Sequence, residues 1–471
     1  MSVNPEILAE EVDPGQQGIL AEKTESGQGV ESPLGLFGTI KWSITAALKA
    51  FKDAPLPSLL LILLWANLNT GPWTITSDLT DLTSLRSCLP YVLGPLAIIF
   101  FLTNMHGIRR GSGAGAVIAL LIYGLFALLF SFNSPGPVPA FYFGLVFVAT
   151  VLTSMLFMAK NTEINQLAEN SVQLTWVIEA AFAIVVVYYA RSALFSPERE
   201  SAYNILTDLQ GQSRSSGVAR FIAIPAILAL SRAWHGKGVS RFLLIPVFVT
   251  LAGALLRLES RGAIFGLGGA ACFILISGRI SPKYIVAVVV LMAAIFFAAS
   301  IGNPSDNFIS ETVMKHITRG QSDSDLVSMT GRTSFWKRGW EVMWDSGMFF
   351  GFGNQADRYL AGGHIHNTWL QALMFGGLIG FVFFLLSWII TWINIVQVFF
   401  RRALLNEGEW LLFHESAAIW IFFTIRAVPE TTNASFAVDL LVMCPIMVYF
   451  GYLATKLKRK APLPGEIVSE A

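Results

Sequence analysis

The stretch MFGGLIGFVFFLLSWIITWINIVQV, residues 374–398, contains no Asp, Glu, Lys or Arg and is followed closely by Arg401 and Arg402. About 20 apolar residues cross the hydrocarbon core of a bilayer, so this stretch predicts a transmembrane helix with a basic end. The rest of the chain is similar, since 54% of its 471 residues are hydrophobic and only 13% are charged. Soluble domains carry about 25% charged residues. The sequence therefore predicts an all-α, polytopic membrane protein.

Comparable apolar runs recur along the chain and divide it into segments. We expect about twelve transmembrane helices, one long loop before the tenth of them, and an interfacial segment at 37–52. The expected segments are an acidic, disordered tail (1–36), nine helices (37–302), the loop (303–366), three helices (367–455) and a basic tail (456–471). The expected spans lie near 56–72, 89–105, 114–132, 138–159, 174–195, 219–234, 242–259, 262–277, 283–302, 374–398, 411–428 and 436–454.

Lys and Arg in the short loops indicate which side of the membrane each loop faces. Every second loop is basic, whereas the alternate short loops, 134–138 and 429–434, contain neither residue. Because basic loops stay in the cytoplasm, both termini are expected there and the long loop is expected outside. The residues that carry this pattern are Arg109, Arg110, Lys237, Arg241, Arg279, Lys283, Arg401 and Arg402.

Composition also bears on the class of function. The net charge of +1 argues against nucleic acid as a partner, since a nucleic-acid site needs a basic patch. The three cysteines predict neither a disulfide framework nor a metal site. His364 and His366, two positions apart, lack the nearby Cys or carboxylate that would complete a zinc set. We therefore expect no metal and no other cofactor.

Charged residues at the predicted helix ends gather on one side of the membrane. Charge inside a bilayer is costly and usually functional, although each residue alone also fits snorkelling or a helix–helix ion pair. Together with the long loop, the outer charges predict a site at the outer leaflet. Glu179, His414 and Glu415 lie nearer the inner side. The outer group comprises Arg257, Glu259, Arg261, Arg426, Glu430 and Asp439.

Part of the long loop has helical periodicity. Phe335, Trp336, Trp340, Met343 and Trp344 recur at helical spacing, with charged residues between them. This pattern predicts an amphipathic helix on the membrane surface or, equally, a small helix packed within the loop. The two candidate roles for Trp336 and Trp340 are stacking on sugar rings and anchoring the loop, and we favour anchoring. The GFG sequence that follows is weak evidence for phosphate binding, because no strand precedes it.

The order of short motifs from residue 210 to residue 400 resembles that of the O-antigen ligase and polymerase family. Twelve spans and one long outer loop before the tenth also match this family. Each motif is short, but their order, spacing and sidedness are specific in combination. The motifs are Ser260-Arg261-Gly262, Gly331-Arg332, Trp336, Gly351-Phe352-Gly353, His366-Asn367 and Gly376-Gly377.

The resemblance implies an inverting, metal-independent glycosyltransferase in a bacterial inner membrane, with its active site facing the periplasm. The implied donor is a glycan on undecaprenyl diphosphate, and the implied acceptor is the lipid A core or a lipid-linked repeat unit. Arg261 and Arg332 match the family's motif arginines and would bind the diphosphate, since Arg pairs with phosphate through two hydrogen bonds. His366 would accept the proton of the acceptor hydroxyl as general base. Asn367 is expected to cap the helix that follows.

Two features depart from the family's pattern, and two other classes of function stay open. The departures are the acidic tail at 1–36 and His364 beside His366, for which we expect only a loop-packing role. The alternatives are a transporter or flippase of lipid-linked glycans, and a scaffold subunit with this fold but without the chemistry. A transporter should show internal repeats and helices broken near the midplane, and no repeat is apparent. Ligase and polymerase share the donor chemistry, so the sequence favours neither.

Overall fold

The computed structural model describes residues 36–68, 85–104, 113–159, 164–189, 191, 194, 215–236, 239–258, 260–277 and 332–460. These residues form helices and contain no strand. The helices are α2 (Leu36–Asp53), α3 (Pro55–Ala66), α4 (Leu85–Asn104), α5 (Gly115–Leu129), η2 (Phe130–Asn133), α6 (Pro137–Ala159), α7 (Ile164–Tyr189), α10 (Ser215–His235), α11 (Val239–Arg257), α12 (Arg261–Ser277), α16 (Arg332–Val342), η3 (Met343–Gly347), α17 (Ala356–Leu360), α18 (Thr368–Phe400), η4 (Arg402–Leu404), α19 (Glu407–Arg426) and α20 (Val438–Lys460).

The described helices follow the spans expected from the sequence. Each expected span overlaps a helix except 283–302, which lies outside the described residues, and α2 occupies the expected interfacial segment. Within the described part, six helical stretches are long and apolar enough to cross a membrane. The chain is therefore a multi-pass helical membrane protein, and the total of twelve spans stays a prediction. Residues 1–35, 303–331 and 461–471, which include most of both expected tails, also lie outside the described part.

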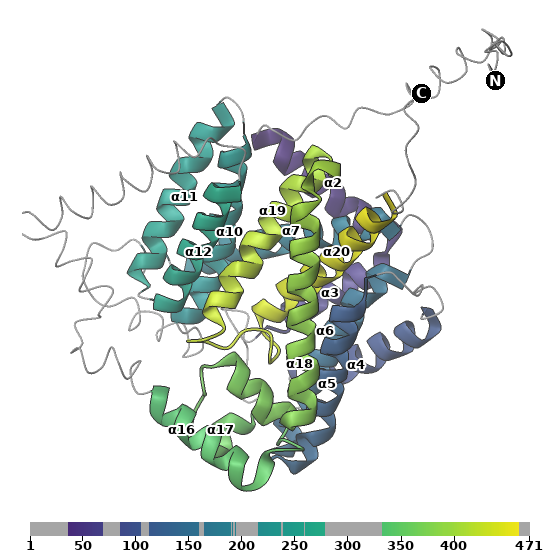
Figure 1. The fold of residues 1–471 in the computed structure, drawn as a ribbon, viewed down its shortest axis with the longest axis vertical. Coiled ribbons are helices and arrows are strands. Elements are labelled where there is room, and N and C mark those ends of the chain that lie inside the picture. Colours follow the sequence, from purple (N-terminus) through teal and green to yellow (C-terminus); the bar gives the residue numbers. More distant parts are fainter. Residues whose placement is uncertain are drawn as a thin grey trace, which may run out of the picture.

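Helix α20 lies in the middle of the bundle and is enclosed by its neighbours (Figure 1). Nearly every residue from Val438 to Leu457 is buried, and α20 contacts α5, α6, α7, α18 and α19. Small residues permit close helix approach elsewhere in the bundle: Gly266 of α12 lies against Phe422 of α19. Such contacts matter in a membrane, where lipid tails are as apolar as the side chains and packing drives association.

Buried ion pairs join α19 to neighbouring helices at two levels. Near its C-terminus, Arg426 donates to Asp439 of α20 at 2.8 Å, and Asp439 also accepts from Arg220 of α10 at 3.1 Å. Near the middle of α19, Glu415 accepts from Arg232 of α10 at 2.7 Å. The structure thus shows helix–helix pairing for Arg426, Asp439 and Glu415, which is one of the two interpretations that the sequence allows.

Helix α18 is broken at Gly377, where φ is 59° and ψ is −173°. A straight helix of its 33 residues would be about 50 Å long, against about 30 Å for the bilayer core. The GFG segment bonds to the backbone at this break: Phe352 N donates to the oxygen of Met374 at 2.8 Å, and Gly353 N donates to that of Phe375 at 3.0 Å. The glycines of this motif therefore serve a structural joint between the loop and α18.

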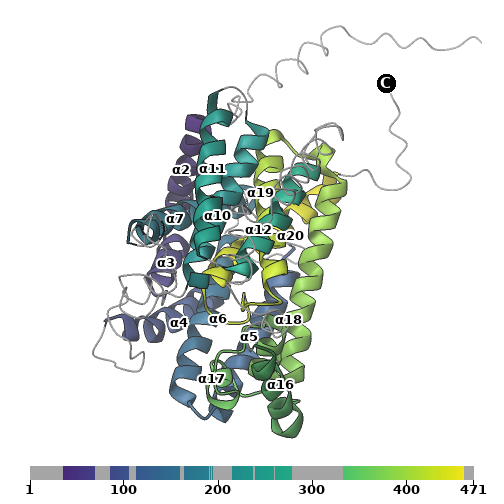
Figure 2. The ribbon, with the colours of Figure 1, turned by 90° about the vertical axis from the view of Figure 1, so that its left-hand side faces the viewer.

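The two ends of the bundle differ. At one end α16, η3, α17 and their connections form a cap, residues 332–367, beside the end of α5 (Figures 1 and 2). The start of α11 and the end of α18 lie at the opposite end (Figure 1). Arg241 belongs to that first turn of α11, and Arg401 and Arg402 directly follow α18. These are among the basic residues that the sequence predicts on the cytoplasmic side, and the orientation itself stays a prediction.

Candidate active site

Asn367 begins α18 and fixes the loop that carries the histidines. Its side-chain oxygen accepts a hydrogen bond from the backbone N of Leu370 at 2.9 Å, so the expected N-cap is confirmed. Its Nδ2 donates to the backbone oxygen of Val428 at 3.1 Å. The next residue, Thr368, donates through Oγ1 to the backbone oxygen of Glu430 at 2.9 Å. The start of α18 is thereby bound to the loop between α19 and α20.

The carboxylate of Glu430 lies between two residues that the sequence assigned to the site. Its Oε2 is 3.0 Å from Nδ1 of His366, and its Oε1 accepts a hydrogen bond from Nη2 of Arg332 at 2.9 Å. Glu430 is nearly buried, whereas 18% of the His366 side chain and 22% of the Arg332 side chain are exposed. Part of the His366 side chain and part of the Arg332 side chain are therefore accessible, and the buried carboxylate of Glu430 binds both.

Electrostatic interactions keep Glu430 ionised. Burial raises the pKa of its carboxyl, but the hydrogen bond from His366 and the positive charges of Arg332 and Arg426 outweigh burial. The net pKa of Glu430 lies far below its usual value. For His366 burial acts in the opposite direction and lowers the pKa. The hydrogen bond and charge of Glu430 raise it in part, and the net pKa of His366 is below the usual value. At neutral pH the pair thus consists of a carboxylate and a neutral imidazole.

This ionisation state determines the tautomer of His366. An ionised carboxylate only accepts hydrogen bonds, so Nδ1 of His366 carries the proton and donates it to Glu430. The other ring nitrogen, Nε2, is then unprotonated and basic. A carboxylate that orients a histidine in this way is the arrangement by which hydrolases present a general base. The geometry therefore equips His366 to accept a proton through Nε2.

Arg332, the first residue of α16, uses both ends of its guanidinium at this corner. Besides the contact of Nη2 with Glu430, Nη1 donates to the backbone oxygen of Pro429. These contacts use two of the five N–H donors of a guanidinium, which leaves capacity for an anionic ligand. The side chain therefore holds the site together as well as contributing positive charge to it.

Arg261 begins α12 at the same corner. A side chain added at the next residue, Gly262, would lie 3.3 Å from Cγ of both Glu430 and Pro429. Helix α12 also packs along α19, whose C-terminus precedes this loop. The structure thus brings the start of the Arg261 helix to the residues that bind Arg332 and His366. Arg257 ends α11 nearby in the chain, and Glu259 lies outside the described residues.

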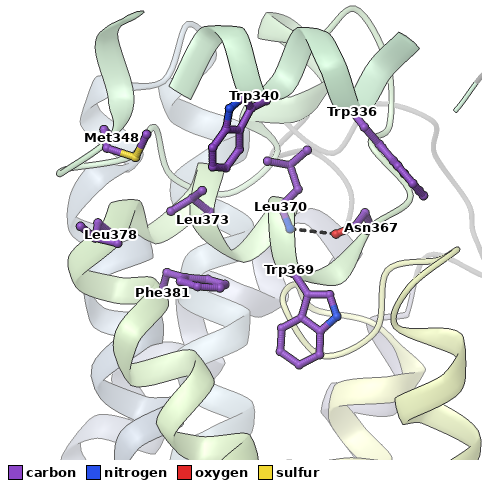
Figure 3. Close-up of a pocket in the computed structure, with 9 residues that line it drawn as sticks. All are labelled: Trp336, Trp340, Met348, Asn367, Trp369, Leu370, Leu373, Leu378 and Phe381. Atoms are coloured by element: carbon purple, nitrogen blue, oxygen red, sulfur yellow. Dashed lines mark hydrogen bonds between the residues drawn. The ribbon is translucent and has the colours of Figure 1, made fainter. Parts of the chain in front are cut away.

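The two tryptophans of α16 have different surroundings. Nε1 of Trp336 donates to the backbone oxygen of Ile365 at 2.7 Å, which anchors the histidine loop to α16. Trp340 is half exposed. Both line an apolar pocket of about 480 Å³ beside the start of α18, seen in Figure 3. The pocket residues are Trp336, Trp340, Met348, Asn367, Trp369, Leu370, Leu373, Leu378 and Phe381.

His364 belongs to a second carboxylate–imidazole pair. Its Nδ1 is 2.7 Å from Oδ2 of Asp357, a fully buried residue of α17. The same oxygen accepts from Gln371 Nε2 at 3.1 Å and from the backbone N of Ile365 at 3.2 Å. The His364 and His366 rings are adjacent, with centroids 4.4 Å apart. The sequence predicts only a loop-packing role for His364, whereas the structure also gives it a specific partner, Asp357.

The sequence alone did not assign Glu430 or Asp357 the role of orienting a histidine. Glu430 carries a signal, because it is an acid in a short outer loop that has no Lys or Arg. Its partners lie 64 residues away for His366 and 98 residues away for Arg332. Asp357 stands in a turn-rich segment, and nothing in its spacing indicates burial. Only the folded structure places these carboxylates beside the histidines.

Comparison with known families supports the assignment of the motifs. Residues 246–385 match the family described as O-Antigen ligase, a segment that includes Arg261, Arg332 and His366. This match confirms the resemblance to the O-antigen ligase and polymerase family. No curated protein matches the chain.

Proposed function

With residues 246–385 matching the O-antigen ligase family, we propose that the protein is a membrane glycosyltransferase of surface-polysaccharide biosynthesis. It transfers a glycan from an undecaprenyl-diphosphate donor to an acceptor hydroxyl at the periplasmic face of a bacterial inner membrane. The acceptor is the lipid A core in a ligase or a lipid-linked repeat unit in a polymerase. The observation that carries the proposal is the contact of Glu430 with both His366 and Arg332, which joins a candidate base to a candidate diphosphate ligand.

In the proposed reaction His366 activates the acceptor. The acceptor oxygen attacks the anomeric carbon of the donor sugar, and its proton passes to Nε2 of His366. The Nδ1–H of His366 stays hydrogen-bonded to Glu430, which stabilises the imidazolium that forms. Because the pKa of His366 is lowered mainly by burial, the ring is neutral before the reaction at neutral pH.

The arginines stabilise the leaving group. As the new glycosidic bond forms, the bond between the anomeric carbon and the diphosphate oxygen breaks, and negative charge grows on the diphosphate. Guanidinium groups pair with phosphate oxygens and stay charged, so Arg261 and Arg332 are placed to stabilise this charge. Attack from the face opposite the diphosphate inverts the anomeric configuration in a single displacement. The reaction needs no metal, because the two arginines supply the positive charge.

The test is transfer by purified protein in lipid, with a diphosphate-linked glycan donor and an acceptor. A positioned general base contributes on the order of 10²–10⁴ in rate, so His366→Ala should lower product formation by about that factor. Donor binding should persist, since Arg261 and Arg332 are unchanged. Lys337→Ala is the matched control, because 80% of this α16 side chain is exposed and it should leave transfer unchanged.

Other outcomes identify other functions. Equal transfer by the His366→Ala protein would assign the base to another residue. Glycan that crosses the bilayer without forming a new glycosidic bond would identify a transporter, and the absence of both activities in the intact protein would favour a scaffold.

A further inference from the structure

The cap contains two carboxylate–imidazole pairs side by side, and the proposed reaction uses only one of them. Glu430 orients His366, while the buried Asp357 binds His364, and the two rings lie 4.4 Å apart between centroids. We propose that the Asp357–His364 pair is a positioning pair, which holds a second imidazole against His366 and keeps His366 neutral and in place for proton abstraction. This inference rests on the proposed function of His366.

The first argument is the charge balance around Asp357. Its side chain is completely buried, and one oxygen, Oδ2, accepts from His364, from Gln371 and from the backbone N of Ile365. Burial raises the pKa of Asp357, but the hydrogen bond and charge of His364, the hydrogen bond from Ile365 N and the charge of Arg358 together outweigh this effect, and the net pKa is below the usual value. A buried carboxylate needs a compensating charge. His364 is the side chain in closest contact with this carboxylate, at 2.7 Å, so the pair fixes the His364 imidazole beside His366.

The second argument is the electrostatic effect of His364 on its neighbour, which lowers the pKa of His366. A positive charge within about 4–6 Å disfavours a second one. The groups that act on His366 are Glu430, which raises its pKa, and His364 and Arg332, which lower it together with burial. Other charged groups of this region are Asp357, Arg338 and Arg358 of the cap, Arg261 at the start of α12, and Arg426 with its partner Asp439. His364 is the one in ring contact with the base.

The third argument is the backbone between the two pairs. His366 has φ of 48°, in the left-handed region that residues other than glycine rarely adopt. The preceding residue, Ile365, is fully buried, its N donates to Asp357 and its oxygen accepts from Trp336. Strained backbone persists only where its surroundings hold it. Asp357 therefore also holds the turn that directs the side chain of His366.

The experiment is the pH profile of glycan transfer in the full-length protein in lipid. A base works when deprotonated, so the rate rises as pH increases through the pKa of His366. His364→Gln removes an imidazole whose charge lowers the pKa of His366, so the pKa of His366 should rise and the acid limb of the profile should move upward by about one pH unit. Asp357→Asn should lower the rate of transfer, because an amide oxygen holds His364 and the backbone N of Ile365 less firmly than a carboxylate does.

A second measurement removes the dependence on activity. The chain has only six histidines, so ring resonances of histidine-labelled protein can be assigned by comparison with His366→Ala. The titration of His366 should move upward in pH in His364→Gln and stay unchanged in the control Lys337→Gln. This readout still applies where Asp357→Asn or His364→Gln lowers the rate through loop disorder.

The outcomes separate this inference from the proposed function. If His366→Ala abolishes transfer while His364→Gln leaves both the acid limb and the His366 titration in place, the positioning pair is overturned and the general base stands. A uniform loss of rate without a shift would reduce His364 to loop packing and also overturn the inference. If His366→Ala transfers glycan normally, the proposed function of His366 itself is wrong.

Discussion

Nδ1 of His366 lies 3.0 Å from the carboxylate of Glu430, although 64 residues separate them in the chain. The same carboxylate binds Arg332 of the cap, so it joins the histidine loop, the cap and the α19–α20 loop. One acidic side chain therefore fixes the tautomer of the candidate base and the position of a candidate diphosphate ligand. This arrangement makes Glu430 the residue whose replacement tests the site most directly.

Glu430→Gln should keep the shape of this contact and lose its charge. A glutamine amide can donate to Nδ1 of His366 and favour the opposite tautomer, in which Nε2 carries the proton and is no longer basic. We expect transfer to fall by a factor of about 10²–10⁴, as for other bases whose orienting carboxylate is lost. Initial rates at saturating donor measure the effect. Wild-type rates from this variant would show that tautomer control is unimportant.

The depressed pKa of Glu430 also predicts how stability depends on pH. The folded protein holds this carboxyl ionised far below its usual pKa of 4.5, so the stabilisation is complete above about pH 4.5 and is lost as pH falls below that value. Thermal unfolding in lipid or detergent should therefore show a steeper loss of stability below pH 4.5 for wild type than for Glu430→Gln. Equal slopes for the two proteins would contradict the ion-pair assignment.

The arginines should respond to changes of shape as well as charge. Arg332→Lys keeps the charge but loses the planar group that binds two oxygens, so we expect a large loss of transfer. Arg261→Ala should have a comparable effect while the protein still inserts and accumulates. Rates and donor affinity are measured together, with the exposed Lys337→Ala as control. Normal glycan extension by both variants would remove the arginines from the site.

Sidedness can be tested with reporters fused at two points. A reporter after Arg402 should lie in the cytoplasm, and one near Ser322 should lie in the periplasm, because the basic loops alternate with short loops that have no Lys or Arg. Alkaline phosphatase, active only outside, and a fluorescent protein, active only inside, distinguish the two sides. The reverse result at either point would move the proposed site to the other face of the membrane.

The joint at the break of α18 predicts that neither Gly351 nor Gly377 tolerates a side chain. At Gly351, φ is +64° and an added Cβ would lie 2.4 Å from the backbone N of Gly377, so Gly351→Ala should destabilise the protein by at least about 1–3 kcal/mol. Gly268→Ala is the control, since nothing lies within 4 Å of an added Cβ there. Thermal stability and accumulation in membranes report the difference. Equal behaviour of the two variants would mean that the joint is not required for folding.

Much of the helix bundle follows from the sequence, because a contiguous apolar run of membrane-spanning length predicts a helix whatever that helix packs against. The pattern located each expected span for which the structure describes residues. It also located the capping residue Asn367, because N-capping depends on neighbours a few positions away. The break in α18 is different: the pair Gly376-Gly377 is visible in the sequence, but the non-helical backbone at Gly377 depends on the GFG segment reaching it.

The site is less predictable than the fold for a physical reason. The motif residues Arg332 and His366 were found by resemblance, but their shared contact passes through Glu430, which is distant in the chain. Asp357 was missed because a short turn gives no sign that a carboxylate will be buried in it. A carboxylate orients another group only at a suitable distance and angle, and the spacing of residues along the chain determines neither.

The joint between the GFG segment and α18 bears on how this protein can be recombined with its relatives. Backbone bonds run from Phe352 and Gly353 into the broken turn, and Leu378 N donates back to the oxygen of Met348 at 2.7 Å. A chimera that exchanges only the cap, residues 332–367, would separate the two halves of this joint. The transplantable unit runs from Arg332 to Leu378, and loop-swapping experiments that seek new acceptor specificity should exchange the cap together with the first turns of the span.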